Sequence, residues 1–496
     1  MMSKKVNQLH PVTILISFFA SLKSIVIPGI IIILGRGFRY SLNPASEYFV
    51  DTIIALVIIL SVLFAILFIA FVKWKRFIYW FEDEELRIEY GLFVKKKRYI
   101  PLERIQSLNY KEGIFHRPFK LVKVSIETAA DSGGKSEADL IAITRVQADA
   151  IEKEMKNAKL QHRPLDEINL TEKDLHISKL PSNRMIIHQM SVRDLIVLAT
   201  TSSSIGVVFS GLAAITSQVD DWIPYERIYG EFQSFIKLGV LMVTIAVLIF
   251  LLISWIASVA ITIVSYFGFV VEKEEDKLLI SKGLLEKKRV TIPMKRIQGI
   301  RIIENPFRQL FGYVTIVIES AGSSGEKDEK KIVLLPIVKK QQAFVILERL
   351  FPEIQWNLPM QRAPKKSLPR YTFKYLFWLL PVILVVSYFT FPFGLWSLLI
   401  LPFAIIVGVW QHYSAGYAIS KQQLTIVYRG ISKTTFVTVK KRIQAMSLSQ
   451  SFFAKKKELA TLTVHIMSGI TGSKAAIKHF DQITLEKILK WYQPEK

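Results

Sequence analysis

Three stretches of this chain are variants of one another, and they decide how the chain folds. Glu89–Leu108 reads EYGLFVKKKRYIPLERIQSL, Ser281–Ile300 reads SKGLLEKKRVTIPMKRIQGI and Val427–Met446 reads VYRGISKTTFVTVKKRIQAM. Arg-Ile-Gln recurs in all three, with a glycine 13, 13 and 12 residues before its arginine. A phenylalanine follows that arginine by 11 residues each time. Agreement at so many positions indicates an internal repeat.

Each copy of the repeat has the pattern of short strands closed by a helix. Residues 86–90 and 278–282 alternate apolar and polar side chains, as strands with one buried face do. The glycine that follows marks a turn, because glycine tolerates a positive φ. Amphipathic helices are expected at Thr144–Asn157, Val338–Phe351 and Asp481–Trp491. We expect a small antiparallel β-barrel or sandwich with one C-terminal helix in each copy.

Six apolar stretches precede the copies in pairs. A bilayer span needs about 20 mostly apolar residues. Such stretches run over Val12–Leu34, Val50–Val72, Val192–Thr216, Ile236–Phe267, Thr372–Phe391 and Phe393–Gln411. The chain of 496 residues is 51% hydrophobic and only 21% charged, which excludes an ordinary soluble enzyme.

The predicted fold class is an α+β membrane protein with six transmembrane helices in three hairpins and a β-domain after each hairpin. The expected hairpins are residues 12–72, 192–267 and 372–412, and the expected β-domains are residues 73–158, 268–353 and 413–493. Residues 159–191 and 354–371 are expected to be linkers.

The distribution of charge predicts the orientation. Residues 217–235, between the third and fourth spans, carry four acids against one arginine and are expected outside the cell. The net charge is +24, and the three hydrophilic segments hold +4, +8 and +10 of it. We therefore expect a multi-pass protein of the cell membrane with both termini and all three β-domains in the cytoplasm. The basic residues that flank spans on that side are Lys73, Lys75, Arg76, Lys365, Lys366 and Arg370.

Runs of lysine and arginine within the copies are candidates for contact with anionic phospholipids, since each such residue near a negative leaflet contributes about 1 kcal/mol. A specific headgroup pocket is a narrower version of this hypothesis. The alternative is that the runs reflect orientation bias and solvated strand faces. Nucleic acid is not expected, because aromatic side chains do not interleave with these lysines. The runs are Lys95, Lys96, Lys97, Arg98, Lys287, Lys288, Arg289, Lys440, Lys441, Lys455, Lys456 and Lys457.

Arg-Ile-Gln is expected to be mainly structural, with the isoleucine in the core and the polar side chains bonded to neighbours. A binding surface in each copy is the alternative. Triplication favours structure, because fold constraints are shared by all copies whereas a site need not be. The residues are Arg104, Ile105, Gln106, Arg296, Ile297, Gln298, Arg442, Ile443 and Gln444.

Small residues recur every fourth position in two spans and predict close helix packing. They are Ser202, Gly206, Ser210, Ser254, Ser258 and Thr262. A polar permeation path near Thr200–Ser204 is the alternative, but the spans hold almost no charge apart from Lys23. Lys23 either reaches the membrane surface or is a functional intramembrane charge.

Side chains for catalysis or metal binding do not form any recognisable constellation. The chain has no cysteine, and its eight histidines show no metal-ligand spacing. We therefore expect no catalytic residues, no metal site and no cofactor.

A hairpin followed by strands, an Arg-Ile-Gln element after a glycine turn and a closing helix resembles the bacterial pleckstrin-homology-like (PH) domain. Three such units in a row are similar to the YdbT-type bacterial membrane proteins. The resemblance implies a PH-like β-barrel or sandwich in each copy and offers no active site. The third copy departs most, with Val439 in place of proline and Lys457 in place of Phe119 and Phe311.

The favoured function is a non-enzymatic membrane scaffold whose cytoplasmic PH-like domains bind partner proteins or the anionic inner leaflet. The resemblance suggests a shorter one-domain relative as a membrane-protein partner. Tolerance of envelope stress or of membrane-active peptides is a role to be tested. The alternative function is a transporter or exporter gated by its cytoplasmic domains.

Overall fold

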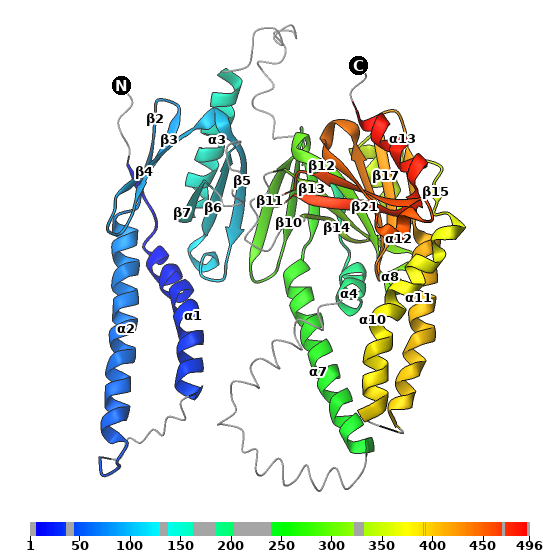
Figure 1. The fold of residues 1–496 in the computed structure, drawn as a ribbon. Helices are drawn as coiled ribbons and strands as arrows, with labels where there is room; N and C mark the ends of the chain where they lie inside the picture. Colours follow the sequence, from blue (N-terminus) through cyan, green and yellow to red (C-terminus); the bar gives the residue numbers. More distant parts are fainter. Residues whose placement is uncertain are drawn as a thin grey trace.

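The structure is a computed structural model that describes residues 6–35, 44–128, 137–161, 184–202, 240–321, 332–389, 391, 393–468 and 472–493. It contains three β-domains of one design, each built from a four-stranded sheet, a three-stranded sheet and a closing helix. Figure 1 shows the sheets side by side in a row, with the long apolar helices extending from one side of that row.

Domain 1 consists of β1 (Asn7–Gln8), β2 (Ile78–Glu82), β3 (Glu85–Tyr90), β4 (Lys96–Pro101), β5 (Ile105–Glu112), β6 (Leu121–Thr128), β7 (Ala138–Thr144) and α3 (Arg145–Gln161). Its hairpin consists of α1 (Val12–Gly35) and α2 (Phe49–Lys75).

Domain 2 repeats this order with β8 (Met185–Gln189), β9 (Val270–Glu274), β10 (Lys277–Lys282), β11 (Lys287–Pro293), β12 (Ile297–Glu304), α8 (Pro306–Leu310), β13 (Tyr313–Ser320), β14 (Ile332–Lys339) and α9 (Lys340–Leu350). The described parts of its hairpin are α4 (Val192–Thr200) and α7 (Val240–Tyr266).

Domain 3 consists of β15 (Gln361–Arg362), β16 (Gly416–Ile419), β17 (Gln423–Arg429), β18 (Lys433–Val439), β19 (Ile443–Ser449), α12 (Phe452–Lys455), β20 (Leu459–Ile466), β21 (Ser473–Asp481) and α13 (Gln482–Tyr492). Its hairpin consists of α10 (Leu368–Phe389) and α11 (Ile400–Ser414).

One strand of every domain comes from ahead of the hairpin. β8 and β15 lie within residues 159–191 and 354–371, so the prediction that these two segments are only linkers needs correction. β1 occupies the same place before α1 and pairs with β2. The added strands are two to five residues long, which is too short for alternation to stand out beside a strongly apolar helix. Each hairpin is therefore an insertion between two strands of its own domain.

Neighbouring domains share continuous antiparallel sheets. The order β7-β6-β5-β11-β10-β9-β8 joins domain 1 to domain 2, and β14-β13-β12-β18-β17-β16-β15 joins domain 2 to domain 3. In both, the fifth strand of one domain pairs with the fourth strand of the next. The residue opposite Lys287 is Glu112, and the residue opposite Lys433 is Glu304. The three domains thus form one head-to-tail row with a common register.

The core of each domain lies between its two sheets and under its closing helix. In domain 1 the cluster includes Leu86 from the first sheet, Ile126 from the second and Ile151 from α3. The isoleucine of Arg-Ile-Gln is buried in all three domains, as Ile105, Ile297 and Ile443. In each domain this isoleucine begins the first strand of the second sheet, with its side chain against the core.

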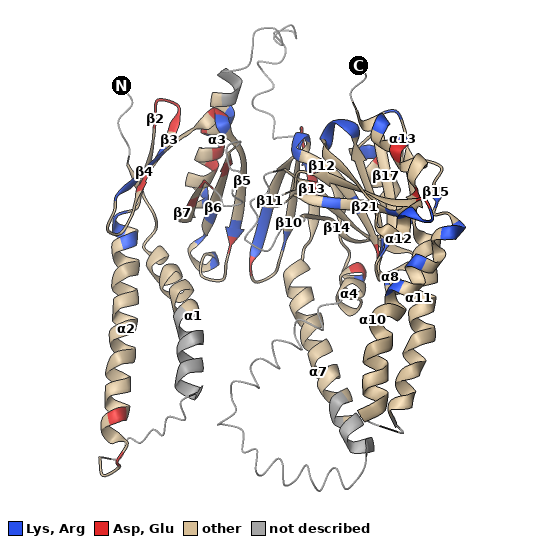
Figure 2. Ribbon diagram, viewed as in Figure 1, with Lys and Arg blue, Asp and Glu red and all other residues tan. Residues whose placement is uncertain are grey.

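Four helices among the described residues are long and apolar enough to cross a membrane: Phe49–Lys75, Leu248–Tyr266, Lys365–Phe389 and Gly394–Ser414. Most of their side chains are exposed, as lipid-facing residues are. Figure 2 shows these helices almost free of charged residues below the sheets, whereas lysine and arginine gather on the domains and at the helix ends beside them. The third predicted span continues beyond α4 into residues outside the described part.

Candidate membrane-facing surface

Each domain is fastened to its hairpin through the turn that contains the repeated glycine. In domain 1 the Arg76 guanidinium donates to the carbonyl of Leu92. In domain 2 the amide of Gly283 donates to the carbonyl of Phe267 at 2.9 Å. In domain 3 the Gln411 side chain donates to the carbonyl of Gly430 at 2.9 Å. The glycine turns therefore lie at the end of the second helix of each hairpin.

A second loop, between the fifth and sixth strands, contacts the first helix of each hairpin. Phe115 stacks on Phe19 of α1 with ring centroids 4.9 Å apart. Arg308 donates to the hydroxyl of Thr201, which directly follows α4, at 2.9 Å. The matching contact in domain 3 joins Arg370 of α10 to Ser451 at 3.5 Å. These contacts hold both loops of every domain beside the apolar helices.

The two loops carry large apolar side chains that the fold leaves exposed. The exposed fraction is 92% for Phe93, 81% for Leu310 and 71% for Phe453. Exposed apolar groups next to membrane-spanning helices are typical of side chains at the level of the lipid headgroups. The set, called the loop-tip residues below, is Phe93, Val94, Phe115, Phe119, Leu285, Phe307, Leu310, Phe311, Ile431, Phe452 and Phe453.

The predicted basic runs divide among different environments. Lys95 and the run Lys455–Lys457, which begins at the last residue of α12, lie beside loop-tip residues and are exposed. Lys96–Arg98 occupy β4, where they are exposed. The equivalent run, Lys287–Arg289, lies on β11 and is paired with β5 of domain 1. This pairing places the run at a junction between domains, and Arg289 is also bonded to Glu272 of its own domain at 3.3 Å.

Lys440 and Lys441, which were also predicted to contact lipid, do not lie beside the loop-tip residues. They follow β18, whose other end adjoins the glycine turn that is bonded to α11. Seven strand residues separate these ends by about 20 Å. The basic residues alone do not reveal this position, because the direction of a strand, rather than its charge, decides which of its ends lies beside the hairpin.

A spin label at Phe453→Cys is expected to be relaxed more by oxygen dissolved in lipid than by a water-soluble nickel complex. A label at Lys441→Cys is the matched control and is expected to show the opposite preference. The chain has no native cysteine, so each label is unique. Equal accessibility at the two positions in liposomes would contradict the membrane-facing surface.

The polar residues of Arg-Ile-Gln have different surroundings in the three copies. Arg296 reaches back to domain 1, where it bonds the Glu127 carboxylate at 3.1 Å and the Thr128 carbonyl at 3.1 Å. Gln298 donates to the Arg296 carbonyl at 3.0 Å. Arg104 and Arg442 make no such contact within the described residues, and Gln106 and Gln444 lie beside them at strand starts. The arginine therefore has a role between domains in the second copy.

The small-residue positions can be followed only in part. Ser254, Ser258 and Thr262 are buried on α7, and the Thr262 hydroxyl donates to that of Ser202 at 3.5 Å. Gly206 and Ser210 lie outside the described residues, as does the side chain of Lys23. Close packing of α4 and α7 thus involves the predicted positions that the structure describes.

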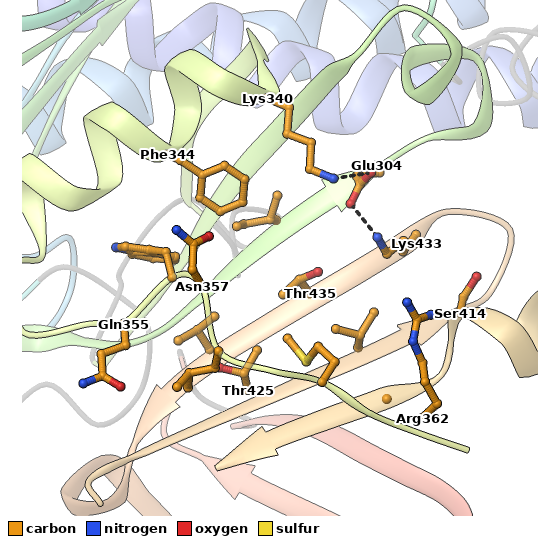
Figure 3. A pocket seen from close by; sticks show the side chains of 17 residues that line it. Glu304, Lys340, Phe344, Gln355, Asn357, Arg362, Ser414, Thr425, Lys433 and Thr435 are labelled. Carbon is orange, nitrogen blue, oxygen red and sulfur yellow. Dashed lines mark hydrogen bonds and ion pairs between the residues drawn. The ribbon is translucent and has the colours of Figure 1, made fainter. Parts of the chain in front are cut away.

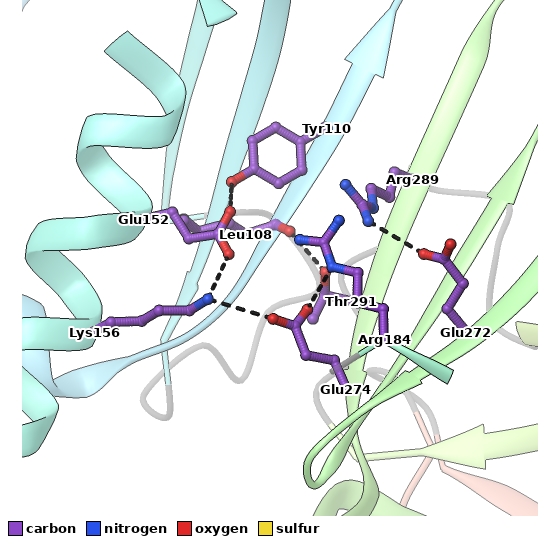
Figure 4. Close-up of polar contacts among 9 residues, drawn as sticks. All are labelled: Leu108, Tyr110, Glu152, Lys156, Arg184, Glu272, Glu274, Arg289 and Thr291. Atoms are coloured by element: carbon purple, nitrogen blue, oxygen red, sulfur yellow. Dashed lines mark hydrogen bonds and ion pairs between the residues drawn. The ribbon is translucent and has the colours of Figure 1, made fainter. Parts of the chain in front are cut away.

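Polar side chains from both domains hold the first junction together (Figure 4). Lys156 of α3 is bonded to Glu274 of domain 2 at 3.4 Å, and Arg184 binds the same carboxylate at 3.2 Å. Thr291 of β11 donates to the Leu108 carbonyl at 3.1 Å. This network supplements a strand pairing of only three residue pairs.

A cavity of about 400 Å³ lies at the second junction (Figure 3). Its charged wall is the buried Glu304, bound to Lys340 at 3.4 Å and to Lys433 at 3.1 Å. Because Lys340 belongs to domain 2 and Lys433 to domain 3, the carboxylate joins the two domains. The remaining wall includes Phe344, Trp356 and other apolar side chains.

Histidines in the described residues do not form a metal-binding group. No group of three or more His, Asp or Glu side chains there could hold a metal ion. Burial, followed by the positive charges of Arg370, Lys478 and Lys374, lowers the pKa of His479 to about 4. Burial also lowers the pKa of His188. Both are neutral at pH 7 and suit packed positions.

Comparison with known proteins identifies the family of the repeated unit. A family model described as Bacterial PH domain matches residues 18–159, 223–353 and 376–496. The chain belongs to the bacterial PH domain family. UPF0699 transmembrane protein YdbT of Bacillus subtilis (strain 168) is 35% identical over 506 residues, which cover 100% of this chain and 99% of the relative. No solved structure matches the chain.

The predicted family and the three repeats are therefore confirmed, and the chain is a membrane protein with three bacterial PH domains. The loop-tip residues were missed as a surface. The signal was present, because Phe115, Phe307 and Phe453 recur at the same spacing as the glycine and the arginine. A repeated aromatic residue in a polar loop does not pack in a core, so its recurrence could have predicted contact with the membrane.

Proposed function

We propose that this bacterial PH domain protein is a non-enzymatic scaffold of the cell membrane. Its three domains form a row held against the inner leaflet, where they offer binding surfaces to other membrane proteins. The observation that carries the proposal is that every domain is attached to its own hairpin at two loops and to its neighbour by a shared sheet. Such attachments suit a fixed platform.

The cytoplasmic orientation is part of the proposal. Lys73, Lys75 and the following Arg76 lie at the end of α2 that enters domain 1, and Lys365 and Lys366 precede α10, the first helix of the domain 3 hairpin. Basic residues at these ends favour the cytoplasmic side. The exposed run Lys455–Lys457, which follows Phe452 and Phe453, is suited to anionic headgroups, whose attraction adds to apolar insertion.

Crosslinking followed by co-purification from native membranes tests the scaffold. We expect another membrane protein to be recovered in a fixed ratio to the full chain. The ratio is expected to fall several-fold in the variant Phe307→Ser/Phe311→Ser/Phe452→Ser/Phe453→Ser, because domains 2 and 3 lose their contact with the leaflet. The variant Lys440→Ser/Lys441→Ser is the matched control and should keep the ratio, since these residues lie away from the membrane.

Recovery of phospholipid alone would contradict the scaffold. In that case the purified chain in liposomes should be assayed for movement of ions or peptides, which would favour the transporter hypothesis. If the ratio of partner to full chain is unchanged in the loop-tip variant, partner binding does not depend on contact with the leaflet.

A further inference from the structure

The two junctions between domains follow one rule, and the rule leaves one strand open at each end of the row. The fifth strand of a domain, called its sending edge, pairs with the fourth strand of the next domain, called its receiving edge. β5 and β12 are occupied sending edges, and β11 and β18 are occupied receiving edges. Among the described residues, β4 of domain 1 and β19 of domain 3 remain at the edges of their sheets.

Exposure at matched positions shows the difference between an open and an occupied edge. Tyr99 of β4 is 52% exposed, whereas the residues at the same position are half-buried Thr291 in β11 and buried Val437 in β18. On the sending side, Ala445 of β19 is exposed while Ser107 and Gly299 are buried. Both open strands are thus accessible along the side that their counterparts use for pairing.

Carboxylates mark the two occupied sending edges. They lie 8 and 23 residues after the arginine of Arg-Ile-Gln, as Glu112 and Glu127 in domain 1 and as Glu304 and Glu319 in domain 2. Glu127 accepts a hydrogen bond from Arg296 of domain 2, and Glu304 is bonded to Lys433 of domain 3. Glu319 accepts one from Ser473 of domain 3 at 3.1 Å. Glu112 lies opposite Lys287 of domain 2 but forms its ion pair with Arg145 of domain 1, at 2.7 Å. Three of the four acids therefore bond the following domain directly.

The sending edge of domain 3 has lost both acids. Gln450 and His465 occupy the positions 8 and 23 residues after Arg442. Gln450 instead bonds Gln482, the first residue of α13, at 2.8 Å. A second copy of this chain would therefore bring a neutral strand to any receiving edge.

The receiving edge of domain 1, in contrast, keeps the basic residues of an occupied one. A lysine lies nine residues before the arginine in every copy, as Lys95, Lys287 and Lys433. Arg104 corresponds to Arg296, and it is exposed without a polar partner among the described residues. Lysines on an edge strand also prevent unspecific pairing. Arg104, however, lies outside the strand. At the equivalent position of domain 2, Arg296 bonds a carboxylate of the preceding domain.

We propose that β4 of domain 1, with Lys95 and Arg104, receives a β-sheet edge of another protein that carries carboxylates at the positions of Glu112 and Glu127. The inference rests on the proposed scaffold function and names its binding surface. Backbone pairing supplies affinity at such an edge, as in β-strand addition, and the two acids supply register and specificity. The partner is a sheet edge of the same kind as β5 and β12, borne by a different chain.

Disulfide trapping between two purified full-length chains tests the charge rule directly. Lys96→Cys on β4 and Ser449→Cys on β19 would lie opposite each other in the register of both junctions, and the chain has no other cysteine. We expect little Lys96→Cys to Ser449→Cys dimer between otherwise unaltered chains. Adding Gln450→Glu and His465→Glu to the Ser449→Cys chain should raise the dimer at least about tenfold, because the edge regains both acids.

Arg104→Glu in the Lys96→Cys chain should cancel that rise, and a single sharp peak in size-exclusion chromatography checks that each variant is folded. Gln450→Glu and His465→Glu are also tested singly, so that one poorly folded variant does not decide the result. Abundant dimer without the acids would overturn the proposal by showing that a second copy is accepted. Absence of a rise with folded acid variants would overturn it as well. Neither result affects the co-purification test of the scaffold.

Discussion

Replacing Arg301 by methionine is expected to lower the free energy of unfolding by about 3–5 kcal/mol. The Arg301 side chain is 4% exposed and that of Glu319 is fully buried, with 2.5 Å between guanidinium and carboxylate. The variant would leave a buried carboxylate without its positive partner, which is far costlier than losing an exposed ion pair.

The loss of stability should be largest at the junction of domains 2 and 3. Arg301 lies on β12, and its guanidinium also bonds the Tyr428 hydroxyl and the Lys474 carbonyl of domain 3. Its charge stands 4.7 Å from the centre of the Phe436 ring. We therefore expect protease cleavage between domains 2 and 3 at a lower temperature, measured on the full chain in detergent alongside thermal unfolding.

Arg289→Met is the matched control at the first junction. Arg289 and Glu272 are each more than a fifth exposed, so their ion pair is screened and contributes about 0–1 kcal/mol. A double variant, Arg301→Met/Glu319→Gln, should recover much of the lost stability, because no unpaired charge remains. Equal destabilisation by Arg289→Met and Arg301→Met would show that burial of the Arg301–Glu319 pair does not increase the loss in the free energy of unfolding.

The sequence predicted the domains better than the way they join. Local periodicity and the repeated glycine and isoleucine indicate strands, turns and a core, because these depend on neighbours close in the chain. Pairing of β5 with β11 joins residues about 180 positions apart, and nothing in the local pattern of Lys287–Arg289 distinguishes an occupied edge from the open one at Lys96–Arg98. Only the relative placement of domains separates the two runs.

The acids of the junctions illustrate the same limit. Glu127 and Glu319 look like ordinary solvent-facing residues of an alternating strand, yet both are buried where the next domain arrives. In the third copy His465 stands at the position of Glu127 and Glu319, and the sequence alone does not explain the difference. Among the described residues no domain follows domain 3, so its sending edge has no receiving edge to match.

Gly283→Ala is expected to destabilise domain 2 by about 2–4 kcal/mol, whereas Gly430→Ala should have little effect. Gly283 has a φ of +107°, and a β-carbon there would lie 2.0 Å from the carbonyl oxygen of Glu286. Backbone cannot move aside as the end of a flexible side chain can. Gly430 has no positive φ and no atom within 4 Å of an added β-carbon.

The difference follows from the spacing of 13 residues in the second copy and 12 in the third. The shorter connection to Lys433 forms a different turn, in which the glycine is not strained. Because Gly283 and Leu284 also donate to the end of α7, the alanine variant should loosen domain 2 from its hairpin. Thermal unfolding in detergent, with hydrogen exchange at β10 and β11, measures both effects, and equal losses in the two variants would contradict this account of the turn.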